Sequence, residues 1–452
     1  MTSTVRRAAA FALVGTLSLV VPAVRGAELP ADGVLAGVSP SVVVTVAAVG
    51  PFALIAALAL TVISDGVLFE LFARPGDREE RTLYGLAGFA LAIAGLALLA
   101  VQFGLPAWVF AASVFVLAYG NLTGHAVRSV TGERFVSTAG FVVGGLVAGT
   151  VGGVLAARLS GVSVALPYVV FLAASGGLLG ALLRSMLFER DDPLVVLSIG
   201  LLLWLFTDLP IEVTARGIAV ALVVTAVLGY VSYALDTASL PGMLTGVFLG
   251  LLTIVLGDFR WFAMLITFFG LGGLSTKFRY DEKQTRGIAE PNEGARGSGN
   301  VLANSVVALA AVLAAAASPS HTGVDPSVFL YAFAGAVAAA MSDTFSSEFG
   351  GLFDEPRLIT TFERVDPGTD GAITWQGELA GLAGAAIIAG IAAVGFPRVG
   401  TSGAAIIVGA GFVGMTVDSL LGATVEGRLV GNQGVNLLAT LAAAVVAAAV
   451  VV

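Results

Sequence analysis

The stretch Gly85–Val101, GLAGFALAIAGLALLAV, contains no charged side chain and no polar side chain. A helix needs roughly 20 such residues to cross the hydrocarbon core of a membrane, which is ~30 Å thick. Comparable stretches recur along the whole chain of 452 residues, which is 57% hydrophobic and only 12% charged. Soluble domains carry roughly 25% charged residues, so most of this chain does not face water. The sequence therefore predicts an all-α polytopic membrane protein.

The recurring apolar stretches predict about fifteen transmembrane helices. The first follows Arg6 and Arg7 and resembles a signal peptide. Because no clear cleavage site precedes Arg25, we expect this segment to be retained as the first helix. The predicted spans are 8–23, 42–64, 85–101, 104–119, 138–157, 164–183, 194–206, 216–232, 240–257, 259–274, 300–317, 327–341, 377–395, 402–420 and 434–452.

Charged residues are distributed unevenly between the predicted loops. With the N-terminus inside, alternation of the spans places most lysines and arginines in the cytoplasm, where basic loops are retained during insertion. Most acidic residues fall on the same side, although acids have little influence on orientation. We therefore expect a multi-pass protein of the cell membrane whose active face is cytoplasmic. The net charge of −8, with Lys277 and Lys283 as the only lysines, is typical of a halophilic source.

Composition excludes several kinds of chemistry. The chain has no cysteine, which excludes disulfides, cysteine zinc sites and thiol catalysis. Its two histidines, His125 and His321, are too few for a metal cage built from histidine. The lipid bilayer is an expected partner, and nucleic acid is not.

The two halves of the chain share a segment. Gly177–Leu187, GLLGALLRSML, aligns without gaps to Gly411–Leu421, GFVGMTVDSLL. This alignment predicts a parallel duplication of a seven-helix unit, and the alternative is a chance similarity between helices rich in small residues. Residues 1–215 would then be a degenerate scaffold, 216–234 a linking helix and 235–452 the catalytic domain. Arg184 stands where the second half has Asp418, so only the second half would keep its chemistry.

A glycine-rich segment of the second half leads directly into a predicted helix. Gly297 and Gly299 lie at its start, and backbone N–H groups at a helix N-terminus are a ready phosphate site. Asn300 and Asn304 lie four residues apart, so both occupy one face of that helix. The alternative is a flexible basic loop that follows the positive-inside rule.

Carboxylates mark two further cytoplasmic segments. Asp343 and Glu348 open the predicted loop 342–376, about 140° apart on an ideal helix, so they can share one ion only if the helix ends or bends between them. Asp370 lies in the turn sequence PGTDG, for which a purely structural turn is the alternative. Asp418 lies between two glycines on one helix face, where its alternative role is simply to face water. Ionisable residues at membrane depth are costly and mark functional sites by default.

These segments resemble the phytyl-phosphate kinase family, an integral membrane domain of unknown function that carries the number ninety-two. The resemblance covers about 235–452. Its ordered blocks are Asp343–Glu348, Pro356–Thr360, Gly368–Gly371, Asp418–Ala423 and Val435–Asn436, with Lys277, Lys283 and Gly287–Glu290 before them.

The resemblance implies transfer of phosphate from a nucleoside triphosphate, CTP or ATP with CTP expected, to a polyprenyl monophosphate such as phytyl or geranylgeranyl phosphate. It implies that Asp343, Glu348, Asp370 and Asp418 hold Mg²⁺. Lys277 joins Asp343, Glu348 and Asp418 as an expected catalytic residue. The residues expected to bind or orient the nucleotide and the phosphates are Arg296, Gly297, Gly299, Asn300, Asn304, Arg357, Gly368, Thr369, Asn432 and Asn436.

Two other functions stay open. The same site would suit a CTP-dependent polyprenol kinase or a cytidylyltransferase that acts on a lipid phosphate. A different class is an ion-coupled transporter, which should keep polar residues at the bilayer midplane in both halves. Here the polar residues lie at predicted cytoplasmic helix ends in one half, which favours an enzyme.

Overall fold

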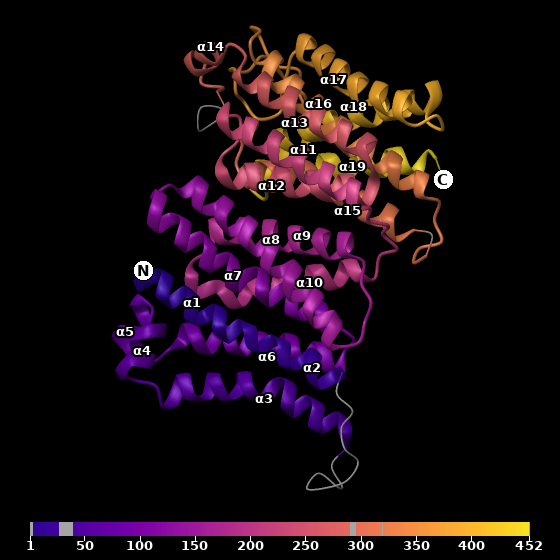
Figure 1. Cartoon of the computed structure of the whole chain (residues 1–452). Coiled ribbons are helices and arrows are strands. Elements are labelled where there is room, and N and C mark those ends of the chain that lie inside the picture. Colours follow the sequence, from indigo (N-terminus) through magenta and orange to yellow (C-terminus); the bar gives the residue numbers. More distant parts are fainter. Residues whose placement is uncertain (1–2, 27–38, 290–294, 319, 452) are drawn as a thin grey trace. The chain divides into compact units, whose positions relative to one another are not determined.

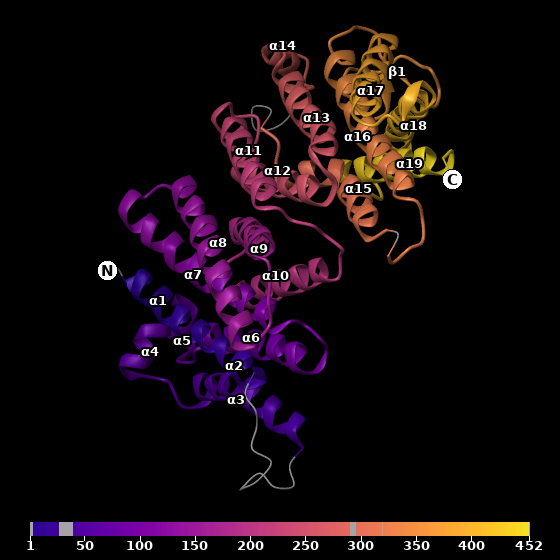
Figure 2. The same cartoon turned by 45° about the vertical axis from the view of Figure 1, so that its right-hand side comes forward.

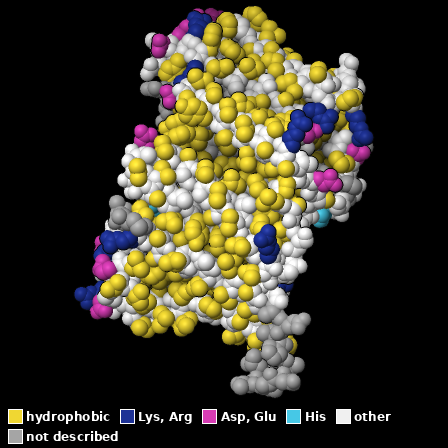
Figure 3. All heavy atoms as spheres, viewed as in Figure 1, with side chains coloured by type: hydrophobic (Ala, Val, Ile, Leu, Met, Phe, Trp, Pro, Cys, Tyr) yellow, Lys and Arg dark blue, Asp and Glu magenta, His cyan; other side chains and the backbone are white. Residues whose placement is uncertain are grey.

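The computed structural model of the chain describes residues 3–26, 39–289, 295–318 and 320–451. Within these residues, fourteen helices are long and apolar enough to cross a membrane by length and composition. A further apolar helix, Asp192–Thr207, is shorter and lies at the predicted span 194–206. The prediction of an all-α polytopic membrane protein is confirmed. Figure 3 shows hydrophobic side chains over much of the visible surface, with charged side chains gathered in a few patches.

The chain divides into two compact units, Met1–Ile218 and Ala219–Val452 (Figures 1 and 2). In the first unit, the deeply buried α7 packs against α1, α8, α9 and α10. The helices of this unit are α1 (Ser3–Thr16), η1 (Leu17–Leu19), α2 (Val20–Gly26), α3 (Pro40–Thr61), α4 (Gly66–Phe72), α5 (Pro75–Glu80), α6 (Tyr84–Gln102), α7 (Ala107–Thr131), α8 (Arg134–Leu159), α9 (Leu166–Met186), η2 (Glu189–Asp191) and α10 (Asp192–Thr207), and α11 (Ala215–Ala234) begins in it.

In the second unit, α16 is the central helix and packs against α13, α15, α17, α18 and α19. The elements after α11 are α12 (Leu240–Leu252), η3 (Thr253–Gly257), α13 (Phe259–Lys277), α14 (Tyr280–Thr285), α15 (Ser298–Ala317), α16 (Pro326–Gly350), β1 (Arg357–Leu358), β2 (Ala372–Ile373), α17 (Trp375–Gly395), α18 (Gly400–Thr424) and α19 (Asn432–Ala449).

A row of glycines sets α17 directly against α16. A Cβ added to Gly377 would lie 2.9 Å from the carbonyl oxygen of Ser346, and one added to Gly381 would lie 2.9 Å from that of Ser342. Small residues at this spacing let two membrane helices approach backbone to backbone. The approach fixes the last two turns of α16, which carry the polar residues of the site.

The helix α16 extends nine residues beyond the predicted end at 341, so Asp343 and Glu348 lie on the helix and not in a loop. The polar side chains lowered the hydropathy there without ending the backbone hydrogen bonding. The hydroxyls of Ser342 and Ser347 donate hydrogen bonds to the carbonyl oxygens of Gly381 and Thr344, respectively. The helix continues without interruption between Asp343 and Glu348, so the two residues start about 140° apart around its axis.

Candidate active site

The second unit contains a polar cavity of about 430 Å³. It lies where α16 and α18 end and where α15, α17 and α19 begin, so the three polar segments of the sequence meet at one face of the unit. The cavity lining includes Arg296, Asn300, Asn304, Asp343, Glu348, Gly368, Thr369, Asp370, Asp418, Asn432 and Asn436 from the predicted site.

Four predicted site residues do not line this cavity. Gly297 and Gly299 lie at the start of α15, where Gly299 leaves room for the amide of Gln433 on α19. Arg357 is exposed in β1 and donates a hydrogen bond to the carbonyl oxygen of Phe362 at 2.6 Å. Lys277 is half-buried at the end of α13. Their roles in phosphate binding stay predictions.

Asp343 and Asp418 form the acidic centre of the cavity. Asp418 on α18 faces Asp343 on α16, close enough for the two carboxyl groups to hydrogen-bond. Gly414 of α18 allows this approach, because a Cβ added there would lie 2.4 Å from the Cβ of Ala339 on α16. The Oδ2 atom of Asp418 is buried and lacks a hydrogen-bond partner within the described residues. Buried carboxylate oxygens are normally paired, so this atom fits a ligand position for a cation.

The acidic residues of the site do not converge on one point. Among the described residues, no three acidic or histidine side chains come together as a metal cluster. Mg²⁺ is usually bound by one or two carboxylates together with waters and substrate phosphates, rather than by a cage made of protein alone. The pair Asp343 and Asp418 fits that mode of binding.

Glu348, which also lines the cavity, is paired with a lysine of α14. Its Oε2 atom lies 2.5 Å from Nζ of Lys283, and the side chains are 7% and 1% exposed. Nζ of Lys283 also donates to the carbonyl oxygen of Ser275 at 2.7 Å, near the end of α13. Lys283 is not among the predicted site residues, although it is one of only two lysines in the chain. Metal binding by Glu348 stays a prediction.

Arg296 is held rigidly at one side of the cavity. Its backbone N–H and C=O form hydrogen bonds of 3.0 Å with Thr237 and Ser239, just before α12. The guanidinium lies 5.2 Å from the ring centroid of Phe268 and 3.4 Å from Oγ1 of Thr344. Arg296 also lines an apolar crevice of about 70 Å³ between α11, α12 and α13.

Two pairs of asparagines face the cavity from the first turns of two helices. On α15, Nδ2 of Asn304 donates to the carbonyl oxygen of Asn300 at 3.0 Å. On α19, Nδ2 of Asn436 donates to Oδ1 of Asn432 at 3.0 Å. The four-residue spacing places both members of each pair on one helix face, as predicted for Asn300 and Asn304.

A two-stranded sheet positions the loop that carries Asp370. Arg357 pairs with Ile373 and Leu358 with Ala372, which brings the turn Gly368–Gly371 onto α18. Gly371 has a φ of +76°, and a Cβ there would lie 2.5 Å from the backbone of Ser419 and Ala423, so only glycine fits. Asp370 is exposed at this turn. Burial and then the negative charge of Asp370 raise the pKa of Glu426 above its ordinary value.

Comparison with known proteins identifies the region that holds this cavity. Residues 223–444 match the family model of the integral membrane protein DUF92. An uncharacterized membrane protein of Methanocaldococcus jannaschii is 33% identical over 207 residues, which cover 45% of this chain and 82% of that protein. The chain belongs to the DUF92 family. The predicted resemblance to domain number ninety-two is thereby confirmed.

Other members of the DUF92 family are more distant. An uncharacterized membrane protein of Synechocystis is 28% identical over 191 residues, which cover 42% of this chain and 72% of that protein. The chloroplastic protein VTE6 of Arabidopsis thaliana is 31% identical over 147 residues, which cover 30% of this chain and 43% of that protein. No solved structure matches the chain. All residues that line the polar cavity lie within the DUF92 region, whereas residues 1–222 lie outside it.

Proposed function

We propose that the second unit transfers the γ-phosphate of a nucleoside triphosphate, with CTP as the expected donor, to a polyprenyl monophosphate. The observation that carries this proposal is that Arg296 lines two unlike sites. One is the polar cavity with Asp343 and Asp418, and the other is an apolar crevice. A substrate with a phosphate head and an apolar chain needs this arrangement. The motifs that the chain shares with phytyl-phosphate kinases support the same activity.

The crevice suits the first part of a prenyl chain. Its walls include Leu228, Met243, Val247, Phe262 and Phe269, from α11, α12 and α13. A volume of about 70 Å³ holds only the beginning of a long chain, so the remainder would lie between the helices in lipid. Arg296 would then bind the acceptor phosphate at the border of the two sites, because a guanidinium fork matches phosphate oxygens.

Asp343 and Asp418 would hold Mg²⁺ together with the phosphates of the nucleotide. The buried Oδ2 atom of Asp418, which lacks a hydrogen-bond partner within the described residues, would be one ligand of that ion. When bound, Mg²⁺ would neutralise the negative charge of the phosphates during transfer. Amide groups of the asparagine pairs would orient the phosphate oxygens.

The proposed reaction requires no nucleophilic side chain. An oxygen of the acceptor phosphate attacks the γ-phosphorus, and the bond between that phosphorus and the oxygen bridging it to the β-phosphate breaks. The nucleoside diphosphate leaves with the electron pair, and the prenyl diphosphate remains. A phosphate dianion already carries its attacking electron pair, so positioning and charge neutralisation supply most of the rate.

An assay with two labels tests this proposal against its alternatives. Purified protein is incubated with Mg²⁺, phytyl monophosphate and CTP labelled at either the α- or the γ-phosphate. We expect γ-label, and no α-label, in phytyl diphosphate. α-Label in the lipid product would show a cytidylyltransferase. In a parallel reaction with phytol added, γ-label that appears on phytol and not on phytyl monophosphate would show a polyprenol kinase. The absence of any labelled lipid would contradict all three activities.

A further inference from the structure

The first unit contains a cavity of its own, of about 290 Å³. It lies at the end of α7, the start of α8 and the end of α9. Its lining includes His125, Arg128, Arg134 and Arg184, with the hydroxyl groups of Ser137 and Thr138, and within the described residues no acidic side chain lines it. A cavity needs only ~10–15 Å³ to hold a water molecule, so this one has room for a ligand of many atoms.

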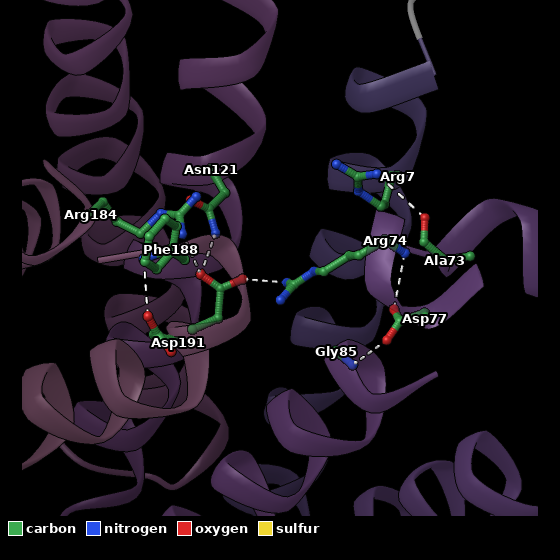
Figure 4. A network of polar contacts seen from close by, with 10 residues as sticks. Arg7, Ala73, Arg74, Asp77, Gly85, Asn121, Arg184, Phe188 and Asp191 are labelled. Carbon is green, nitrogen blue, oxygen red and sulfur yellow. Dashed lines mark hydrogen bonds and ion pairs between the residues drawn. The ribbon is translucent and has the colours of Figure 1, made fainter. Parts of the chain in front are cut away.

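A network of polar contacts lies beside this cavity. Arg74, Asn121 and Arg184 converge on one carboxylate, that of Asp192 (Figure 4). Nη2 of Arg74 donates to it at 2.6 Å, and Nδ2 of Asn121 donates at 3.5 Å. Nη1 of Arg184 lies 3.2 Å from the same carboxylate but makes no hydrogen bond within the described residues. Arg184 lines the cavity, so this nitrogen atom keeps a hydrogen-bond donor for a ligand.

We propose that this cavity is a binding site for a phosphate group. Arginine presents a planar fork of N–H donors that matches phosphate oxygens, and three arginines line or border this one cavity. Ser137 and Thr138 add polar side chains to the lining, and their hydroxyls donate to the carbonyl oxygens of Gly124 and Arg134. The lining lacks the carboxylates that Mg²⁺ would require, so the site binds an anion and does not repeat the proposed chemistry of the second unit.

The setting of the cavity suits the headgroup of a phospholipid. Helix α8 begins at Arg134 beside the cavity and exposes Val143, Val147 and Val151 along one face, each four residues from the next. Such an apolar row faces acyl chains in a membrane. A phosphate bound at the start of α8 would lie at the end of that row, where a phospholipid carries its headgroup. A free phosphate ion shares the same recognition chemistry.

Protection of a single cysteine tests the site without any activity assay. The chain has no cysteine, so Thr138→Cys introduces one thiol at the cavity wall. The rate of its reaction with a thiol reagent is measured on the purified full chain at low salt. Inorganic phosphate and dioctanoyl phosphatidic acid are added separately, with dioctanoyl glycerol as the neutral control.

We expect phosphatidic acid to slow labelling in a saturable way, whereas dioctanoyl glycerol does not. Arg128→Gln should raise the half-protecting concentration roughly tenfold, because a charge-assisted hydrogen bond is lost. Arg128 is exposed, so this substitution leaves folding intact. Arg158→Gln, an exposed arginine at the other end of α8, is the matched control and should change nothing.

The two anions distinguish the source of the phosphate group. Protection by both shows that a phosphate group alone suffices, and protection by phosphatidic acid alone shows that the acyl chains contribute. Protection by neither anion would overturn the proposal. Protection that Arg128→Gln and Arg158→Gln change equally would also overturn it, since the basic lining would then not be the binding element.

Discussion

The Nζ atom of Lys283 lies 2.5 Å from Oε2 of Glu348, and the two side chains are almost completely buried. Lys283 comes from α14, and Glu348 comes from the last turns of α16. The same Nζ atom donates to the carbonyl oxygen of Ser275 at 2.7 Å. One ammonium group thus joins α13, α14 and α16 beside the polar cavity. The pair orders the wall of the cavity, whereas Asp343 and Asp418 form its acidic centre.

Breaking this pair should destabilise the protein. Lys283→Met leaves the Glu348 carboxylate buried without its partner, which costs about 3–5 kcal/mol. The double variant Lys283→Met/Glu348→Met removes both charges and should recover most of that loss. Thermal unfolding in one detergent measures the effect. Lys277→Met, at the other and half-buried lysine, is the control, and equal midpoints for Lys277→Met and Lys283→Met would contradict the structural role.

Asp343 and Asp418 should be indispensable for activity but not for folding. Asp343→Ala and Asp418→Ala each remove a proposed Mg²⁺ ligand, and we expect a loss of phosphoryl transfer of about 10²-fold or more. Asp418→Ala also removes a buried carboxylate oxygen that lacks a hydrogen bond, so the unfolding temperature without Mg²⁺ should not fall.

Asp354→Asn is the matched control for these variants. Asp354 is 85% exposed after the end of α16 and pairs with Arg286 outside the cavity. It should keep wild-type turnover. Wild-type turnover by Asp343→Ala or Asp418→Ala would remove that residue from the proposed metal site, and turnover is measured with the γ-labelled nucleotide.

The stability of the second unit should depend on the protonation of Glu426. Burial first, and then Asp370, raise the pKa of Glu426 above its ordinary value of 4.5. The folded state therefore holds this proton after the unfolded state has lost it. The contribution of protonated Glu426 to the free energy of unfolding is fully present below pH 4.5. It declines as the pH rises through the pKa that Glu426 has in the folded state.

The variant Glu426→Gln stays neutral at every pH and should remove this decline. Its advantage in unfolding temperature over the wild type should grow between pH 4 and pH 7, as measured by thermal scans at several pH values. Glu363→Gln, at an exposed glutamate of the loop after α16, should follow the wild type. Parallel curves for Glu426→Gln and the wild type would contradict the raised pKa.

The cavity should open to the cytoplasm, where nucleoside triphosphates are available. Single cysteines at Ser320, in the turn before α16, and at Ser402, in the first turn of α18, should react with an impermeant thiol reagent outside intact cells. Cysteines at Thr369 and Thr424, both exposed at the cavity face, should react only after permeabilisation. External labelling of Thr369→Cys or Thr424→Cys would place the cavity on the wrong side for a nucleotide.

Hydropathy was sufficient to predict the class of fold. Each predicted span corresponds to an apolar helix of the structure, because membrane depth demands a continuous apolar run. Helix ends were less predictable. The helix α16 continues to Gly350 because Gly377 and Gly381 hold α17 against it, and this tertiary contact leaves no mark in the hydropathy of 342–350. The parallel duplication of the two halves stays a prediction.

The motifs predicted which residues line one cavity better than they predicted how those residues pair with others. Asp343, Asp418 and the asparagines line one cavity because an even number of spans returns the chain to the same face. The pairing of Glu348 with Lys283 could not be read from sequence, since 65 residues separate them and only the fold joins them. Arg296 was predicted as a phosphate ligand, but its position beside an apolar crevice depends on the packing of α11 and α12.

The proposed phosphoryl transfer is tested by the formation of prenyl diphosphate by the purified full chain. Wild-type protein and Asp418→Ala are incubated with phytyl monophosphate, γ-labelled CTP and Mg²⁺, and the lipid product is separated and counted. The proposed function predicts labelled phytyl diphosphate with the wild type, and its loss with Asp418→Ala or when Mg²⁺ is chelated. Equal labelling by the wild type and Asp418→Ala, or labelling that persists without Mg²⁺, would contradict a phosphoryl transfer centred on Asp343 and Asp418.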